Sequence, residues 1–216
     1  MNRKKILITA SILIVILGLY GLINYYSNTY KLIVSFKNVN EVSVYSETDG
    51  KNNKIKTILE SSKGIRLKKG IYIIKYSGSP DYSSGSLEVN VDNEKSVTVD
   101  PSYSKEKLAD LLKDQSSQIN NLLKTQIPKI DLYIVQPGEL YMFGDWYGAV
   151  LTYNGDDAFN ADTLRVVMKK ENNTWKLMTN PPEIMVNKKI HKEIPPEIVD
   201  LINNTQSQIQ SKYTSF

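Results

Sequence analysis

The chain holds few residues in a pattern that could do chemistry. His191 is its one histidine, and the sequence contains no cysteine, so no second imidazole or thiolate could share a metal ion with it. No Gly-x-Ser-x-Gly nucleophile motif, phosphate-binding loop or dinucleotide fingerprint is present. Serine and lysine are abundant, but a Ser–Lys dyad forms in space, and abundance is no evidence for it. We therefore predict that the protein is not an enzyme and has no catalytic residue, metal site or cofactor.

Aromatic residues are densest in the third quarter of the chain. They are Tyr141, Phe143, Trp146, Tyr147 and Tyr153. Successive side chains of a strand point to opposite faces, so Trp146 and Tyr147 cannot both face one core. One set could line a concave sheet face as a ligand groove, and these five residues are the candidate ligand site. The alternative is that a helix covers one face of the sheet and loops cover the other.

A group of acidic and amide side chains raises the question of a calcium site. The group comprises Asn154, Asp156, Asp157, Asn160 and Asp162. Counted from Asp156, Ala158 takes the place of an EF-hand ligand and Ala161 that of the turn glycine. We interpret the group as a polar turn between two strands.

The elements around these residues predict an α+β domain over residues 104–204, followed by a polar tail over 205–216. Apolar residues recur with helical spacing over 104–127, Ser104 is a plausible N-cap, and Pro128 ends the pattern. Strands are expected at 130–135, 140–153, 163–170 and 174–178, and a short helix at 197–203. A long helix followed by an antiparallel sheet, with Trp175 in Asn-Thr-Trp-Lys-Leu, resembles cystatin-like and NTF2-like α+β domains.

Residues 30–101 predict an all-β sandwich. Six or seven short strands follow one another at about ten-residue spacing, with no helical period. The stretch 65–76, Ile-Arg-Leu-Lys-Lys-Gly-Ile-Tyr-Ile-Ile-Lys-Tyr, resembles the strand entry of PEGA-like and transthyretin-like extracellular β-domains. Gly70 and Tyr72 match the turn glycine and the strand aromatic, although the Pro-Glu-Gly-Ala signature is absent. The resemblance implies a structural or binding spacer.

The amino-terminal segment predicts a membrane anchor. Residues 6–23 carry no charge and follow Arg3, Lys4 and Lys5. A helix of this length would be about 27 Å long, close to the thickness of a bilayer's hydrocarbon core. The positive-inside rule then predicts a cytoplasmic tip 1–5, a transmembrane helix 6–24 in the lipid bilayer, and extracytoplasmic C-terminal domains of a single-pass cell-membrane protein. The alternative is a cleaved signal peptide, although no Ala-x-Ala site follows.

The charge distribution argues against a nucleic-acid partner. Of 27 Lys and Arg residues three precede residue 6, which leaves 24 against 23 acidic residues. The stretch 51–75 is nevertheless basic, with Glu60 as its one acid. It could bind an anionic lipid or a surface polymer, or it could be a set of solvated strand faces.

Together these features predict a membrane-anchored, extracytoplasmic structural or protein-interaction protein of a bacterial envelope, without catalytic activity. Its partner would be another envelope protein or a surface polymer. The alternative is a ligand-binding or enzymatic accessory that uses the aromatic groove of the domain 104–204. A deep pocket with clustered polar groups near Trp146 would favour that alternative.

Overall fold

The computed structural model describes residues 3–48, 51–136, 138–156 and 161–205. For residues 3–12, 47, 48, 51 and 52 it describes the backbone alone. The chain divides into two compact units, Met1–Pro101 and Ser102–Phe216. We describe each unit by itself.

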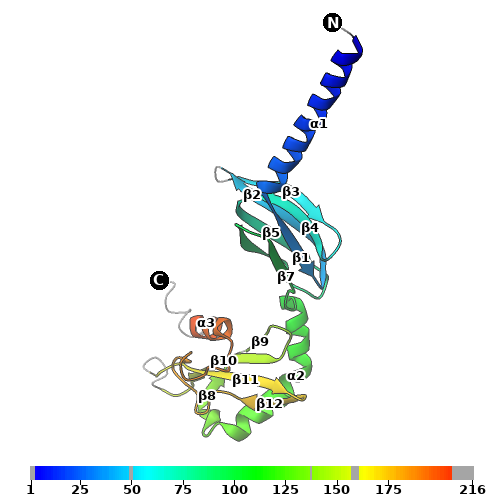
Figure 1. The fold of residues 1–216 in the computed structure, drawn as a ribbon. Coiled ribbons are helices and arrows are strands. Elements are labelled where there is room, and N and C mark those ends of the chain that lie inside the picture. Colours follow the sequence, from blue (N-terminus) through cyan, green and yellow to red (C-terminus); the bar gives the residue numbers. More distant parts are fainter. Residues whose placement is uncertain (1–2, 49–50, 137, 157–160, 206–216) are drawn as a thin grey trace. The chain divides into compact units, whose positions relative to one another are not determined.

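The N-terminal unit consists of a helix, α1 (Arg3–Ser27), and two β-sheets (Figure 1). One sheet has the order β4-β1-β7 and the other the order β3-β2-β5-β6. Strand β1 pairs antiparallel with β4 and parallel with β7, and the second sheet is antiparallel. The strands are β1 (Thr29–Phe36), β2 (Val39–Thr48), β3 (Lys51–Ile58), β4 (Lys63–Lys68), β5 (Gly70–Gly78), β6 (Gly85–Val91) and β7 (Lys95–Val99).

Alternation along the strands places one apolar core between these two sheets. Leu32 and Val34 of β1 are fully buried, as are Val42 and Val44 of β2, because residues two apart share a face. Tyr72 of β5 joins this core, and its hydroxyl donates a hydrogen bond to the carbonyl oxygen of Lys68 at 2.8 Å. The unit is therefore a β-domain in which two sheets enclose a core.

Helix α1 covers the segment for which the sequence predicted a membrane anchor. In the part of the chain that the structure describes, no helix is both long enough and apolar enough to cross a membrane. The predicted transmembrane helix 6–24, with its cytoplasmic tip 1–5, is therefore wrong. The single-pass cell-membrane localisation is wrong for the same reason.

The C-terminal unit begins with a long helix, α2 (Lys105–Gln126), and continues into an antiparallel sheet. The sheet has the order β12-β11-β10-β8, and β9 also pairs with β10. The elements after α2 are η1 (Ile130–Leu132), β8 (Tyr133–Val135), β9 (Glu139–Tyr141), β10 (Trp146–Tyr153), β11 (Leu164–Glu171), β12 (Thr174–Leu177) and α3 (Pro196–Asn204).

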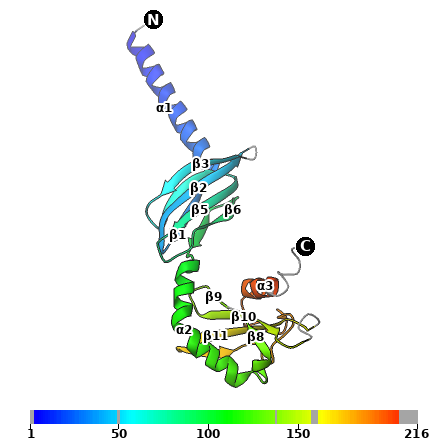
Figure 2. The same cartoon turned by 180° about the vertical axis from the view of Figure 1, so that it is seen from behind.

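The two faces of this sheet have different cores. Ile119 and Leu123 of α2 pack with Tyr147 and Leu151 on one face. On the opposite face Ile198 and its neighbours in α3 pack with the other set of β10 side chains. Figure 2 shows the sheet from behind, with α2 and α3 on different sides of it. Strand β10 is thus covered on both faces.

Local signals explain the ends of α2. The Ser104 side chain accepts a hydrogen bond from the backbone N–H of Lys107 at 3.2 Å, which confirms the predicted N-cap.

Gln115, a polar residue among the apolar positions of the helix, accepts a hydrogen bond from Lys170 Nζ at 3.0 Å. That lysine also lies 5.9 Å from the Trp175 ring centroid, so a polar link joins α2 to the sheet.

The region 140–153, predicted as one bent strand, is a hairpin. Strand β9 ends at Tyr141 and β10 starts at Trp146, and the two pair antiparallel. Between them Met142 and Gly144 adopt positive φ angles of 57° and 81°. Because two left-handed residues so close together reverse the chain, a bend in one strand becomes a full turn.

Candidate interaction surface

The five aromatic residues of the predicted groove lie in three different surroundings. Tyr147 is buried against α2, whereas Tyr141 and Trp146 are buried against α3. Phe143 is 43% exposed, and Tyr153 stacks edge-on against Tyr133 at 5.8 Å. The five side chains therefore do not share one face of the sheet, because alternation along β10 separates Trp146 from Tyr147.

Two of these aromatic residues have perturbed hydroxyl groups. Burial raises the pKa of Tyr141 from 10.0 to about 12, with smaller contributions from Glu139 and Tyr147. Burial likewise raises the pKa of Tyr147 to about 12, although a hydrogen bond with the Gly138 backbone acts in the opposite direction. Both side chains are thus neutral core residues over the physiological pH range.

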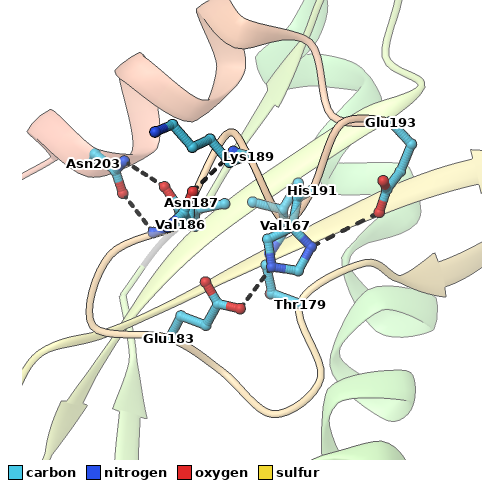
Figure 3. A network of polar contacts seen from close by, with 9 residues as sticks. All are labelled: Val167, Thr179, Glu183, Val186, Asn187, Lys189, His191, Glu193 and Asn203. Carbon is cyan, nitrogen blue, oxygen red and sulfur yellow. Dashed lines mark hydrogen bonds and ion pairs between the residues drawn. The ribbon is translucent and has the colours of Figure 1, made fainter.

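The lone histidine has a structural contact. His191 Nε2 lies 2.6 Å from Glu183 Oε1, and His191 Nδ1 lies 3.8 Å from Glu193 Oε1 (Figure 3). The imidazole is 11% exposed. Among the described residues no three His, Asp or Glu side chains come together to hold a metal ion. Of the group considered for calcium, Asp157, Ala158 and Asn160 lie outside the described residues.

The contact between Glu183 and His191 closes a segment that joins β12 to α3. We call residues 178–195 the closed loop. Besides this contact, the N–H groups of Ile190 and His191 both donate to the carbonyl oxygen of Asn187, at 3.1 and 2.9 Å. The Asn187 side chain accepts a third hydrogen bond, from the N–H of Lys189 at 2.8 Å. These bonds fix the turn at the tip of the loop.

Two further attachments hold the closed loop to the body of the unit. Asn203 of α3 bonds both backbone groups of Val186: its Oδ1 accepts from the N–H at 2.9 Å, and its Nδ2 donates to the carbonyl at 3.0 Å. Figure 3 shows this paired contact beside the histidine contact. The side chains of Val186 and Ile194 are buried under the loop, and the Thr179 hydroxyl accepts from the N–H of Val167 at 2.9 Å.

Arg165 of β11 connects the loop, the sheet and α3. Its backbone forms an antiparallel bridge with Glu183, and its guanidinium donates to the carbonyl oxygen of Ile184. The same guanidinium donates to the carbonyls of Ile202 at 2.9 Å and Asn203 at 3.2 Å, where the C-terminal end of a helix favours a cation. Desolvation by burial lowers the pKa of Arg165. Arg165 therefore attaches the closed loop to both the sheet and α3.

In spite of this fixed backbone, the closed loop exposes large apolar side chains. Ile184, Met185 and Ile190 are 52%, 63% and 67% exposed. The contact between Glu183 and His191 brings the two ends of this segment together, so their sequence neighbours Ile184 and Ile190 lie on the same closed loop. Among the described side chains Lys188 pairs with Asp200 at 2.6 Å, whereas no acidic partner lies beside the exposed Lys189.

Sequence reasoning considered His191 only as a metal ligand and rejected that role, and it missed Arg165 and Asn203. The acceptors of Arg165 are backbone carbonyls, which have no signature in a sequence and lie up to 40 positions away. The pairs of prolines at 181–182 and 195–196 were the available signal, because they mark the segment between them as non-helical and non-strand.

Comparison with known proteins leaves the family open. No family model and no curated protein matches the chain. A crystal structure of a DUF3823 family protein from Bacteroides ovatus is similar to it at 8% sequence identity with a TM-score of 0.24. The similarity covers 69% of this chain and 95% of that chain. The two sheets of the N-terminal unit agree with the predicted β-domain, whereas the PEGA-like or transthyretin-like assignment is not confirmed.

Proposed function

We propose that this chain is a non-catalytic interaction protein whose C-terminal unit binds a partner protein through the closed loop. The N-terminal β-domain would serve as a structural spacer, as PEGA-like and transthyretin-like domains do. The observation that carries the proposal is the combination of exposed apolar side chains and a fixed backbone at Ile184, Met185 and Ile190.

The fixed backbone matters because ordering a loop upon binding opposes association. Each flexible side chain or segment that becomes ordered in a complex costs free energy, so a surface that is already ordered binds more tightly for the same contact area. The hydrogen bonds of Asn187 and Asn203 order the loop before any partner arrives.

The exposed side chains matter because three of them occur on one short loop, whereas single exposed apolar residues are common on protein surfaces. Complete burial of one such side chain against a partner contributes up to roughly 1.5–3 kcal/mol of transfer free energy. Clustered apolar anchors surrounded by polar groups are typical of protein–protein contact sites. Lys189 and Lys192 are exposed on the same loop and would supply the polar rim.

The test is site-specific crosslinking in the cells that make the protein. A photoreactive residue is placed at Met185 in one variant and at Ile190 in a second, and captured proteins are identified by mass spectrometry. We expect both positions to capture the same protein. A third variant carries the photoreactive residue at Ile134, which is exposed on β8 outside the loop, and it should not capture that protein.

The double variant Met185→Asp with Ile190→Asp supplies the quantitative arm. Both side chains are exposed, so the fold should tolerate the change, and binding of the captured protein should weaken at least tenfold. The matched control is Leu132→Asp with Ile134→Asp, which places the same charges at exposed apolar positions elsewhere in the unit. Equal capture from loop and control positions, or equal weakening by both double variants, would refute the proposal.

A further inference from the structure

A cleft in the N-terminal unit lies between the C-terminal end of α1 and the strands next to it. It has a volume of about 980 Å³ and is lined among others by Asn24, Asn28, Ile55, Arg66, Lys68 and Lys69. We call it the basic cleft. Its volume is in the range of small-molecule sites, which are typically about 300–1,000 Å³. The residues that line it include three cations and neither Asp nor Glu.

The strand pattern explains why the cations gather here. Ile65 and Leu67 of β4 are buried in the core, so the alternate residues Arg66 and Lys68 point outward, and Lys69 follows directly. Lys31 of β1 is the cross-strand partner of Arg66, and like charges directly opposite each other destabilise a pair of strands.

Two other lysines of the basic stretch are neutralised by acidic side chains, whereas in the described part of the chain the cations of the cleft are not. Lys54 pairs with Glu41, and Lys63 pairs with Glu60, each at 3.2 Å. Among the side chains that the structure describes, Lys68 and Lys69 have no acidic partner, and both are exposed. Within the described side chains, no carboxylate therefore offsets the positive charge of Lys68 and Lys69 at the cleft.

Hydrogen bonds fix the frame of the cleft. Arg66 Nη1 donates to the carbonyl oxygen of Thr29 at 3.1 Å, and its guanidinium carbon lies 4.4 Å from the Tyr26 ring centroid. The Thr29 hydroxyl in turn donates to the carbonyl of Tyr25 at 2.8 Å, which links the end of α1 to β1. The Tyr72 hydroxyl holds the backbone at Lys68. The two free ammonium groups therefore extend from a fixed backbone.

We propose that the basic cleft binds a ligand that carries phosphate groups, with Lys68 and Lys69 as the residues that contact the phosphates. Lysine ammonium groups bind phosphate as point charges, and Arg66 adds to the positive field while it holds α1. Two adjacent lysines fit a ligand with two or more phosphates better than a single inorganic phosphate. This proposal is independent of the closed loop.

The test is calorimetric titration of the full chain with sodium tripolyphosphate at 50 and 200 mM sodium chloride. We expect saturable binding that weakens at the higher salt concentration, because charge contacts of this kind are screened. The variant Lys68→Glu with Lys69→Glu should bind at least tenfold more weakly. The matched control is Lys129→Glu with Lys176→Glu, which changes the charge equally at exposed positions of the other unit and should bind like the wild type.

A second arm identifies the source of the phosphate. Co-sedimentation with phosphatidylglycerol vesicles, against phosphatidylcholine vesicles, shows whether a lipid headgroup supplies it. Binding to either probe that Lys68→Glu with Lys69→Glu abolishes supports the proposal. If the double variant does not fold, the single variants Lys68→Gln and Lys69→Gln replace it in both binding measurements. Binding to neither probe, or an equal loss in the cleft and control variants, overturns it.

Discussion

Replacement of Arg165 by methionine should loosen the closed loop and destabilise the C-terminal unit. Methionine keeps an unbranched apolar stem but has no hydrogen-bond donor. The variant leaves the carbonyls of Ile184, Ile202 and Asn203 without the guanidinium. The matched control is Lys169→Met on the same strand, which removes the same charge but only a partly exposed ion pair with Glu171 at 2.8 Å and a contact of Nζ 5.6 Å from the Trp146 ring centroid.

The magnitude follows from the number of bonds lost. Each of the three shorter hydrogen bonds of Arg165 contributes about 1 kcal/mol net, and its place at the C-terminal end of α3 adds about 0.5 kcal/mol. Arg165 is only partly buried, so water can reach some of the abandoned carbonyls and reduce the loss. We therefore expect the free energy of unfolding to fall by about 2 kcal/mol. The Lys169→Met control should lose less than about 0.5 kcal/mol.

The two tryptophans make the assay specific for one unit. Trp146 and Trp175 are the only tryptophans of the sequence, and both belong to the C-terminal unit. Urea unfolding followed by tryptophan fluorescence therefore reports this unit, and 2 kcal/mol corresponds to a midpoint shift of about 1–2 M. Hydrogen exchange measured on a peptide that contains Val186 reports the loop, whose N–H bond to Asn203 should open more often in the variant.

Two results would refute this reasoning. If Arg165→Met unfolds within about 0.5 kcal/mol of Lys169→Met, the guanidinium does not carry the stability assigned to it. If the unit is destabilised but the exchange of the Val186 segment is unchanged, Arg165 stabilises the sheet and α3 without ordering the loop. The preorganisation on which the proposed function rests would then have to come from the bonds of Asn187 and Asn203 and from the contact between Glu183 and His191.

Two further predictions concern the core of the same unit. Because Tyr141 and Tyr147 have a pKa of about 12 when folded against 10.0 otherwise, their contribution to stability is complete below pH 10 and is lost as the pH rises toward 12. Absorbance at alkaline pH should therefore show late-titrating tyrosines, among them Tyr141 and Tyr147, until the unit unfolds, and simultaneous titration of all tyrosines in the folded protein would contradict this. Gly138→Ala places a Cβ 2.3 Å from the buried Tyr147 ring and should cost about 1–3 kcal/mol in urea unfolding. Gly70→Ala, whose Cβ meets nothing closer than 3.7 Å, should be nearly neutral, and equal effects of the two substitutions would count against the packing argument.

Features that depend on neighbouring residues could be predicted from the sequence. The helix predicted over 104–127 is α2 (Lys105–Gln126), because periodicity, an N-cap serine and a following proline are all local signals. The β-branched and aromatic run at 70–76 is likewise strand β5. In the same way, alternation on β10 indicated that Trp146 and Tyr147 face opposite sides of the sheet.

Features that depend on backbone geometry or distant partners could not be predicted. The turn between β9 and β10 needs a positive φ at Met142, a residue type that gives no hint of it. The contacts of Arg165 and Asn203 involve main-chain atoms that any residue type could supply. The membrane anchor was predicted from the length and charge of the segment 6–23. That segment does form a helix, but none of the described helices has both the length and the apolar character to cross a membrane.

The order of the strands in the N-terminal unit has a consequence for how the protein behaves at high concentration. Strand β3 is an edge strand of its sheet, and its exposed Lys54 and Lys56 stand where another chain would have to align in order to add a strand. Pairing there would desolvate their ammonium groups, and lysines on edge strands are a common safeguard against amyloid-like assembly. Lys54 and Lys56 thus help to prevent the open edge of this sheet from pairing with the sheet of another molecule.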